Sequence, residues 1–178
     1  MKELYGPVMQ MGFIVDDFEE TIKHWTEKLN VGPFFMLEHL DLKDFHYKGN
    51  NSDIDFSVAI SFSGDIQIEF IKQHCDTPSI YNEYVNNKKN ALHHLCTFTK
   101  DIDSDIKILE SQGYKKLQGG STMDEGTFSY LDIESNFSPI LEIAQLSEGA
   151  LSMFDMIKEA SINWDGKKSI MDLGEISI

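Results

Sequence analysis

The chain repeats itself at an offset of 84 residues, and this repeat limits the possible folds more than any other feature of the sequence. Residues 10–18 align with residues 94–102, which places Gln10 at the position of His94. Both copies begin with an apolar run typical of a strand, continue through an acidic turn and end in a helical pattern. A repeat that preserves the order of its elements predicts two copies of one structural module.

The first half of the chain predicts a strand, a helix and three further strands. The helix carries apolar side chains at helical spacing, and Asp16 or Asp17 is placed to cap it, because a short carboxylate accepts the free N–H groups of a first turn. A turn at residues 63–65 predicts a hairpin. We expect a strand over residues 8–15, a helix over 18–29, a strand over 34–40, a polar loop over 43–53, and hairpin strands over 54–62 and 66–71.

The second half follows the same order after a connector. Asp101 stands where Asp17 stands in the first copy, and a helix starts after it at Ile102 and ends at Gly113. We expect a connector over 75–90 with a short helix at 80–85, a strand over 94–99, a short strand over 114–117, hairpin strands over 126–133 and 139–144, a last helix over 150–162 and an irregular tail.

Four polar residues occupy equivalent places in the two halves. Glu69 and Glu142 each stand alone among apolar residues of the final strand of their half, where a buried carboxylate needs a partner or a metal. With Gln10 and His94 they offer one nitrogen and three oxygens, a set that suits a divalent cation and does not suit a structural zinc site. The alternative is that both glutamates face water and that His94 is a core histidine. His93 points to the other face of its strand, which predicts a surface or supporting position.

Charge and composition exclude several classes of partner. The net charge of −15 and the pI of about 4.6 disfavour nucleic acids and anionic membrane surfaces. All fifteen basic residues are lysines, so no arginine is present to clamp an anionic substrate. Cys75 and Cys96 are too few for a disulfide framework. The apolar run over residues 8–15 is too short to span a membrane and lacks a cleavage signal. We therefore expect a cytoplasmic protein that binds neither nucleic acid nor membrane.

Taken in order, these motifs resemble the vicinal oxygen chelate superfamily, which contains lactoylglutathione lyase (glyoxalase), methylmalonyl-CoA epimerase, extradiol dioxygenases and bleomycin-resistance proteins. The resemblance covers residues 5–145 and is carried by residues 10–18, 68–70, 92–98 and 141–143. The Gln-Glu-His-Glu set is most similar to that of the glyoxalases.

The resemblance implies an α+β fold of two βαβββ modules, whose cupped mixed sheets surround a central metal and ligand cavity, with a C-terminal helix added. The modules would be residues 1–74 and 91–146, joined by a connector at 75–90 and followed by a C-terminal helix and tail at 147–178. It implies a homodimer and one divalent metal ion (Zn, Ni, Co or Mn). The implied ligands are Gln10, Glu69, His94 and Glu142.

The leading functional hypothesis is a metal-dependent isomerase, epimerase or lyase that moves a proton next to a chelated carbonyl of a substrate with adjacent oxygens. Glu142 is the expected base and Glu69 its counterpart or a permanent ligand. A metal-free small-molecule binder of the resistance type is the first alternative. An Fe(II) extradiol dioxygenase is the second, and Gln10 stands where that chemistry needs a histidine. Because arginine is absent, any anionic substrate depends on point charges, for which the candidates are Lys43, Lys48, Lys88 and Lys89.

Overall fold

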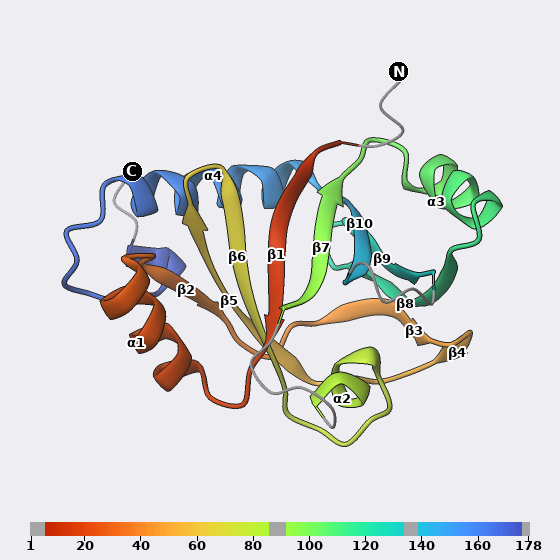
Figure 1. The fold of residues 1–178 in the computed structure, drawn as a ribbon, viewed down its shortest axis with the longest axis horizontal. Coiled ribbons are helices and arrows are strands. Elements are labelled where there is room, and N and C mark those ends of the chain that lie inside the picture. Colours follow the sequence, from red (N-terminus) through yellow and green to blue (C-terminus); the bar gives the residue numbers. More distant parts are fainter. Residues whose placement is uncertain (1–5, 86–91, 134–138, 176–178) are drawn as a thin grey trace.

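The computed structural model describes residues 6–85, 92–133 and 139–175 (Figure 1). Its strands are β1 (Val8–Ile14), β2 (Phe34–Leu37), β3 (Leu42–Tyr47), β4 (Asn50–Asn51), β5 (Phe56–Ser63), β6 (Ile66–Gln73), β7 (Leu92–Phe98), β8 (Lys115–Thr122), β9 (Thr127–Asp132), β10 (Ile140–Gln145) and β11 (Ile170–Met171). Its helices are α1 (Phe18–Leu29), α2 (Ile80–Val85), α3 (Ile102–Ser111), α4 (Glu148–Ile162) and the 3-10 helix η1 (Leu173–Glu175).

One open, mixed sheet holds all of these strands, in the order β11-β2-β5-β6-β1-β7-β10-β9-β8-β3-β4. In the first half β1 runs parallel to β6, and in the second half β7 runs parallel to β10. The two halves meet where β1 pairs antiparallel with β7. The predicted α+β fold of mixed sheet is therefore confirmed, and the two halves share a single continuous sheet. The module boundaries at 75–90 and 147 stay a prediction.

The repeat is visible in the strand register and in the helix caps. Gly12 pairs with Glu69, and Cys96, which stands 84 residues after Gly12, pairs with Glu142. The Asp17 side chain accepts a hydrogen bond from the backbone N–H three residues later, at 2.9 Å, and the Asp101 side chain does the same at 3.1 Å. Both helices thus start with the same carboxylate cap. For α1 the sequence left the cap open between Asp16 and Asp17, and the structure shows Asp17.

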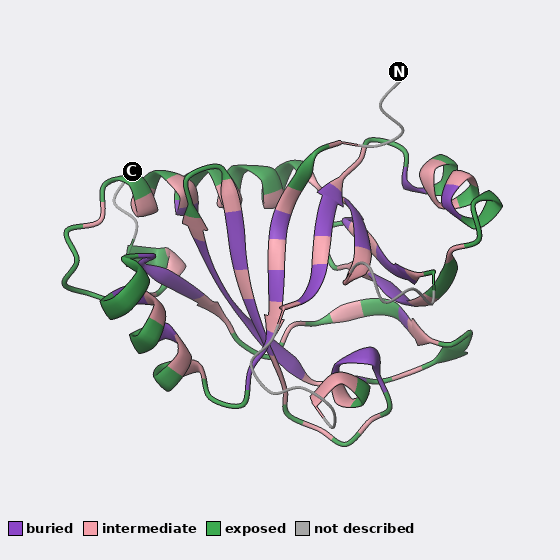
Figure 2. Cartoon of the chain, viewed as in Figure 1, coloured by how far each residue is buried: buried purple, intermediate pink, exposed green. Residues whose placement is uncertain are grey.

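Helices cover both faces of the sheet. On one face Trp25 of α1 packs edge-on against Phe13 and Phe70. On the other face α4 runs behind the strands in Figure 1, and its Phe154 stacks on Phe98 of β7. Figure 2 shows how buried and partly exposed residues alternate along the central strands, as expected for a sheet with one face more covered than the other.

Three segments differ from the sequence-based expectations. The predicted loop over 43–53 is wrong, because most of it forms β3 and β4, and β3 pairs with β8 of the other half. Phe45 of β3 is buried. The strand predicted at 114–117 begins one residue later and extends to Thr122 as β8. The tail is not wholly irregular, since β11 pairs parallel with β2 at the sheet edge. No helix in the described part of the chain is both long and apolar enough to cross a membrane.

Candidate metal centre

Four neighbouring strands at the centre of the sheet each contribute one of the four residues selected from the sequence. In sheet order these are Glu69 on β6, Gln10 on β1, His94 on β7 and Glu142 on β10. His94 is fully buried, and Gln10 and Glu142 are only 5% and 7% exposed. The structure brings all four side chains together on the face of the sheet that α4 covers.

The Nε2 atom of His94 lies at the middle of this group. It is 3.0 Å from Oε2 of Glu142, 3.1 Å from Oε1 of Gln10 and 3.5 Å from Oε2 of Glu69. Two ligand atoms bound at right angles about 2.1 Å from the same ion lie about 3 Å apart. The spacing of these donors therefore matches a common cation.

Burial leaves one of these oxygens without a hydrogen bond. Oε2 of Glu142 is buried, and it has no hydrogen-bond partner among the described residues, although it lies close to His94. A carboxylate oxygen in that position costs free energy unless an ion or a proton compensates it. One imidazole, two carboxylates and an amide oxygen together form a suitable set for a borderline divalent ion such as Zn, Ni, Co or Mn. The residues present thus fit the metal that the sequence implied.

Gly12 makes room for the histidine, and the sequence reading did not select it. Gly12 faces His94 across the β1–β7 pair. A Cβ added to Gly12 would lie 1.8 Å from Cε1 and 2.1 Å from Nε2 of His94. The imidazole therefore occupies the space that any other residue would fill at this position. The available signal was a glycine inside a strand, which often marks a close approach.

Two further residues orient the candidate ligands. Gln67 is fully buried, and its Oε1 accepts a hydrogen bond from Nε2 of Gln10 at 2.5 Å, which turns the Gln10 oxygen toward His94. Nδ1 of His93 lies 3.0 Å from Nδ1 of His94. Of the two positions that the sequence allowed for His93, surface or supporting, the structure shows the supporting one, since His93 is buried and contacts His94. A ligating histidine needs such a partner on its second ring nitrogen.

In the absence of metal, the two glutamates favour a proton on His94. Burial alone would lower the pKa of His94, but the carboxylates of Glu142 and Glu69 outweigh it and raise that pKa to about 9. Burial raises the pKa of Glu69, against the opposing effect of His94. Burial lowers the pKa of His93, and the charge of His94 lowers it further. The site thus holds a cationic His94 next to a neutral His93 until a metal displaces the proton.

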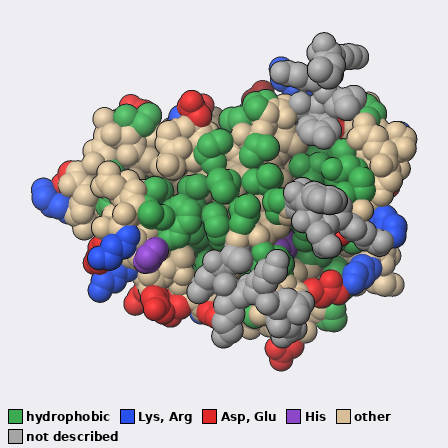
Figure 3. Space-filling model, viewed as in Figure 1, with side chains coloured by type: hydrophobic (Ala, Val, Ile, Leu, Met, Phe, Trp, Pro, Cys, Tyr) green, Lys and Arg blue, Asp and Glu red, His purple; other side chains and the backbone are tan. Residues whose placement is uncertain are grey.

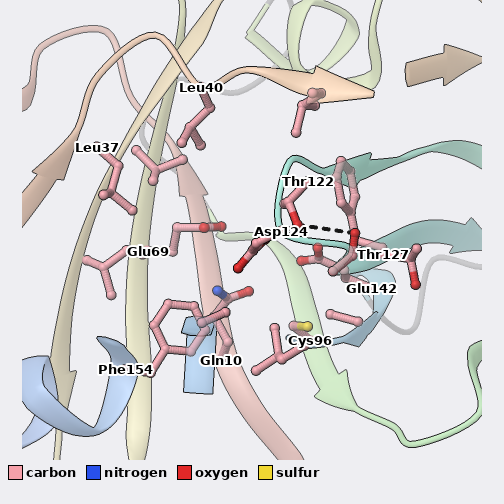
Figure 4. A pocket seen from close by; sticks show the side chains of 18 of the residues that line it. Gln10, Leu37, Leu40, Glu69, Cys96, Thr122, Asp124, Thr127, Glu142 and Phe154 are labelled. Atoms are coloured by element: carbon pink, nitrogen blue, oxygen red, sulfur yellow. Dashed lines mark hydrogen bonds between the residues drawn. The ribbon is translucent and has the colours of Figure 1, made fainter. Parts of the chain in front are cut away.

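A cavity of about 500 Å³ opens in front of these residues. Figure 4 shows Gln10, Glu69 and Glu142 pointing into it, with Phe154 of α4 at one wall. His39, His46 and His74 do not line it. His39 instead binds Asp55 through Nδ1 at 2.6 Å.

The chain is similar to known proteins in sequence and in fold. Residues 9–130 match the family model described as Glyoxalase/Bleomycin resistance protein/Dioxygenase superfamily. No curated protein matches the chain. The hypothetical protein BH1468 from Bacillus halodurans C-125 has a similar structure, with a TM-score of 0.59 at 14% identity over 80% of this chain and 95% of that one.

Two solved epimerases share the fold as well. Methylmalonyl-CoA epimerase from Mycobacterium tuberculosis has a TM-score of 0.59 at 14% identity, over 85% of this chain and 95% of that one. A variant of Streptomyces coelicolor methylmalonyl-CoA epimerase, solved in complex with 2-nitronate-propionyl-CoA, has a TM-score of 0.55 at 12% identity, over 82% and 97% of the two chains. The resemblance noted in the sequence is confirmed, and this chain belongs to the Glyoxalase/Bleomycin resistance protein/Dioxygenase superfamily.

Proposed function

We propose that this protein binds one divalent first-row metal ion through Gln10, Glu69, His94 and Glu142 and catalyses an isomerisation, epimerisation or lyase reaction by moving a proton next to a carbonyl. The observation that carries this proposal is the convergence of three oxygens on Nε2 of His94, at 3.0 to 3.5 Å, at the end of a cavity. The bound metal would polarise a chelated carbonyl and so acidify the neighbouring C–H bond.

The two glutamates divide the proton transfer between them. Glu142 is the proposed base, because its carboxylate is buried next to His94 and lines the cavity that would hold the substrate. Glu69 lies on the opposite side of His94 in the strand order, so it reaches the substrate from the other module. Two carboxylates related by the repeat allow a proton to leave on one side and return on the other, which suits epimerisation and isomerisation.

Metal analysis tests the first half of this proposal. Protein purified without chelator is expected to contain one equivalent of a divalent metal by elemental analysis, and a variant carrying Gln10→Ala, His94→Ala and Glu142→Ala is expected to contain none. Metal absent from the wild-type protein even after reconstitution would contradict the proposal.

Proton exchange tests the second half. Wild-type protein is expected to exchange the C–H proton next to the carbonyl of 2-oxo acids, hemithioacetals, acyl thioesters or α-hydroxyketones in D2O, measured by NMR. Glu142→Gln keeps an oxygen ligand but removes the base, so it should retain metal and lose exchange. Glu110→Gln, at an exposed position on α3, is the matched control and should retain both.

A metal-free binding protein of the resistance type is the second candidate. It is supported by the size of the cavity and by apolar walls such as Ile60, Phe98 and Phe154. An absence of both metal and exchange, together with ligand binding, would favour it. Nothing in the described residues favours the dioxygenase, because Gln10 lies next to Nε2 of His94 where that chemistry needs a second histidine, and His93 contacts Nδ1 of His94 instead.

The homodimer is also part of this proposal, as is the cytoplasmic location. Hydrophobic side chains gather over the central strands on the face shown in Figure 3. On the face of the sheet away from the metal site, Met11, Phe13, Leu95 and Leu141 remain partly exposed. A second copy covering this surface would bury them. Light scattering should give twice the mass of the chain, and Leu95→Lys should shift it toward the monomer.

A further inference from the structure

The charge of the cavity wall carries an inference about the ligand, and it rests on the function proposed above. Much of the wall is apolar, and it includes Leu37, Leu40, Val58, Ile71, Phe128 and Met153. The shape and lining therefore suit a ligand with an apolar body. Its polar groups must then match the few charged residues at the two ends of the cavity.

All of the charged residues that line the cavity are acidic. Glu69 and Glu142 lie at the inner end, and Asp41 and Asp124 are exposed side chains that also line it. No lysine and no histidine is among the described residues that line it. A divalent ion would neutralise the inner pair, but the outer pair would keep its charge.

Hydrogen bonds hold one of the outer carboxylates, Asp124, in place as an anion. Asp124 accepts hydrogen bonds from the hydroxyl of Thr122, at 2.6 Å, and from the hydroxyl of Ser147. These hydrogen bonds hold the pKa of Asp124 below its usual range. The cavity wall next to the β8–β9 turn thus presents a permanent negative charge to any ligand that passes it.

None of the lysines considered from the sequence is among the described residues that line the cavity. Nζ of Lys43 nevertheless donates at 3.1 Å to the backbone carbonyl of Met123, which lines the cavity next to Asp124. Lys48 pairs with Glu83 at 2.6 Å. Lys88 and Lys89 lie outside the described residues. With a net charge of −15, the whole molecule adds to the negative potential at the mouth.

We propose that the cavity takes an uncharged or cationic ligand with an apolar body and a pair of adjacent oxygens, and that it rejects ligands with a carboxylate or phosphate at the outer end. An anionic tail would lie beside Asp41 and Asp124 with no basic residue among the described residues of the cavity wall, whereas an ammonium tail would be attracted to the two carboxylates. This ligand class differs from the coenzyme A esters found in the epimerases of similar fold.

Three hydroxamic acids with the same chelating head and the same eight-carbon chain test this inference. They end in a methyl group, an ammonium group or a carboxylate, and their affinities are measured by calorimetry. On metal-loaded protein we expect the methyl and ammonium compounds to bind at least about tenfold more tightly than the carboxylate compound. Equal binding of all three, or no binding by the first two, would overturn the inference.

Substitutions that remove the outer carboxylates test whether these residues cause the selectivity. Asp41→Asn with Asp124→Asn should bring the carboxylate compound close to the methyl compound. Glu19→Gln with Glu110→Gln changes the net charge equally at exposed positions on α1 and α3 and should leave the gap unchanged. Asp41→Asn alone, at an exposed side chain, reports the same trend if the double variant folds poorly. If the difference in affinity between the methyl and carboxylate compounds persists in the double variant, Asp41 and Asp124 do not cause the selectivity, and the proposal is refuted.

The same compounds separate this inference from the proposed function. Their affinities are measured again on metal-depleted protein. If binding does not depend on metal, the proposed function fails, while the order of the three tails still reports on the charge of the cavity wall. If metal tightens binding but the three tails bind alike, the proposed function stands and this inference fails.

Discussion

The imidazole of His94 lies against the backbone of Gly12, so close that a methyl group at residue 12 would be 1.8 Å from Cε1. Gly12→Ala must therefore displace the ring or separate β1 from β7. We expect the variant to lose about 1–3 kcal/mol of unfolding free energy and to bind metal much more weakly. Urea denaturation and metal titration measure the two effects.

The control for this substitution is Gly174→Ala, because a Cβ at Gly174 meets nothing within 4 Å. It should change neither stability nor metal binding. A Gly12→Ala protein with the metal affinity of the wild type would show that the position of the ring does not determine the site.

His93 is expected to act on the metal through His94. Its Nδ1 lies 3.0 Å from Nδ1 of His94. When His94 carries its proton on Nδ1, that N–H donates to Nδ1 of His93, and Nε2 of His94 is free for the ion. His93→Leu removes this acceptor and should weaken metal binding about 10–100-fold. His93→Asn places an oxygen near the same point and should retain most of the affinity. Competition with a chromophoric chelator measures both, and equal losses in the two variants would reject the role.

The stability of the metal-free protein should fall with rising pH. The pKa of His94 is about 9 in the fold and 6.5 in its absence, so its protonation stabilises the fold fully below pH 6.5 and this stabilisation is lost as the pH rises through about 9. Because each tenfold change in proton affinity corresponds to about 1.4 kcal/mol, the loss amounts to at most about 3.5 kcal/mol.

Urea denaturation with chelator present, from pH 6 to 10, measures this dependence, and His94→Gln should abolish it. Metal affinity should change in the opposite sense and rise over the same range, since the ion competes with the proton on Nε2. A metal affinity that does not depend on pH would argue against His94 as a ligand.

The added helix α4 should be part of the stable fold. Ile157 of α4 is fully buried in the core cluster that includes Phe35, Ile60 and Tyr130. Ile157→Ala is expected to cost about 2–5 kcal/mol. Ile162→Ala, on the same helix but 71% exposed, should stay within about 0.5 kcal/mol of the wild type. Chemical denaturation compares the two, and similar effects would mean that α4 packs differently.

The helices, most strands and the candidate ligands could be predicted because each depends on a pattern within a short stretch of sequence. The caps at Asp17 and Asp101 and the acids at Glu69 and Glu142 repeat at matching positions. The repeat also separated His94, which lies next to the other three candidate ligands, from its neighbour His93.

The parts that the sequence missed depend on distant partners. β3 forms because β8 of the other half pairs with it, and no pattern within residues 43–53 indicates that pairing. β8 continues through Gly119 and Gly120, residues that usually weaken a strand. Here a side chain would not fit at Gly119, where a Cβ would lie 2.6 Å from the carbonyl oxygen of Phe128. The contact between Gln67 and Gln10 likewise joins two buried amides 57 positions apart.

The pairing of β3 with β8 also has a consequence for cooperativity. The two halves are joined at the β1–β7 seam, and β3 from the first half additionally completes the edge strands of the second. Neither half can unfold without breaking a sheet edge of the other. A duplicated fold of this kind is expected to melt in a single transition rather than as two modules in succession.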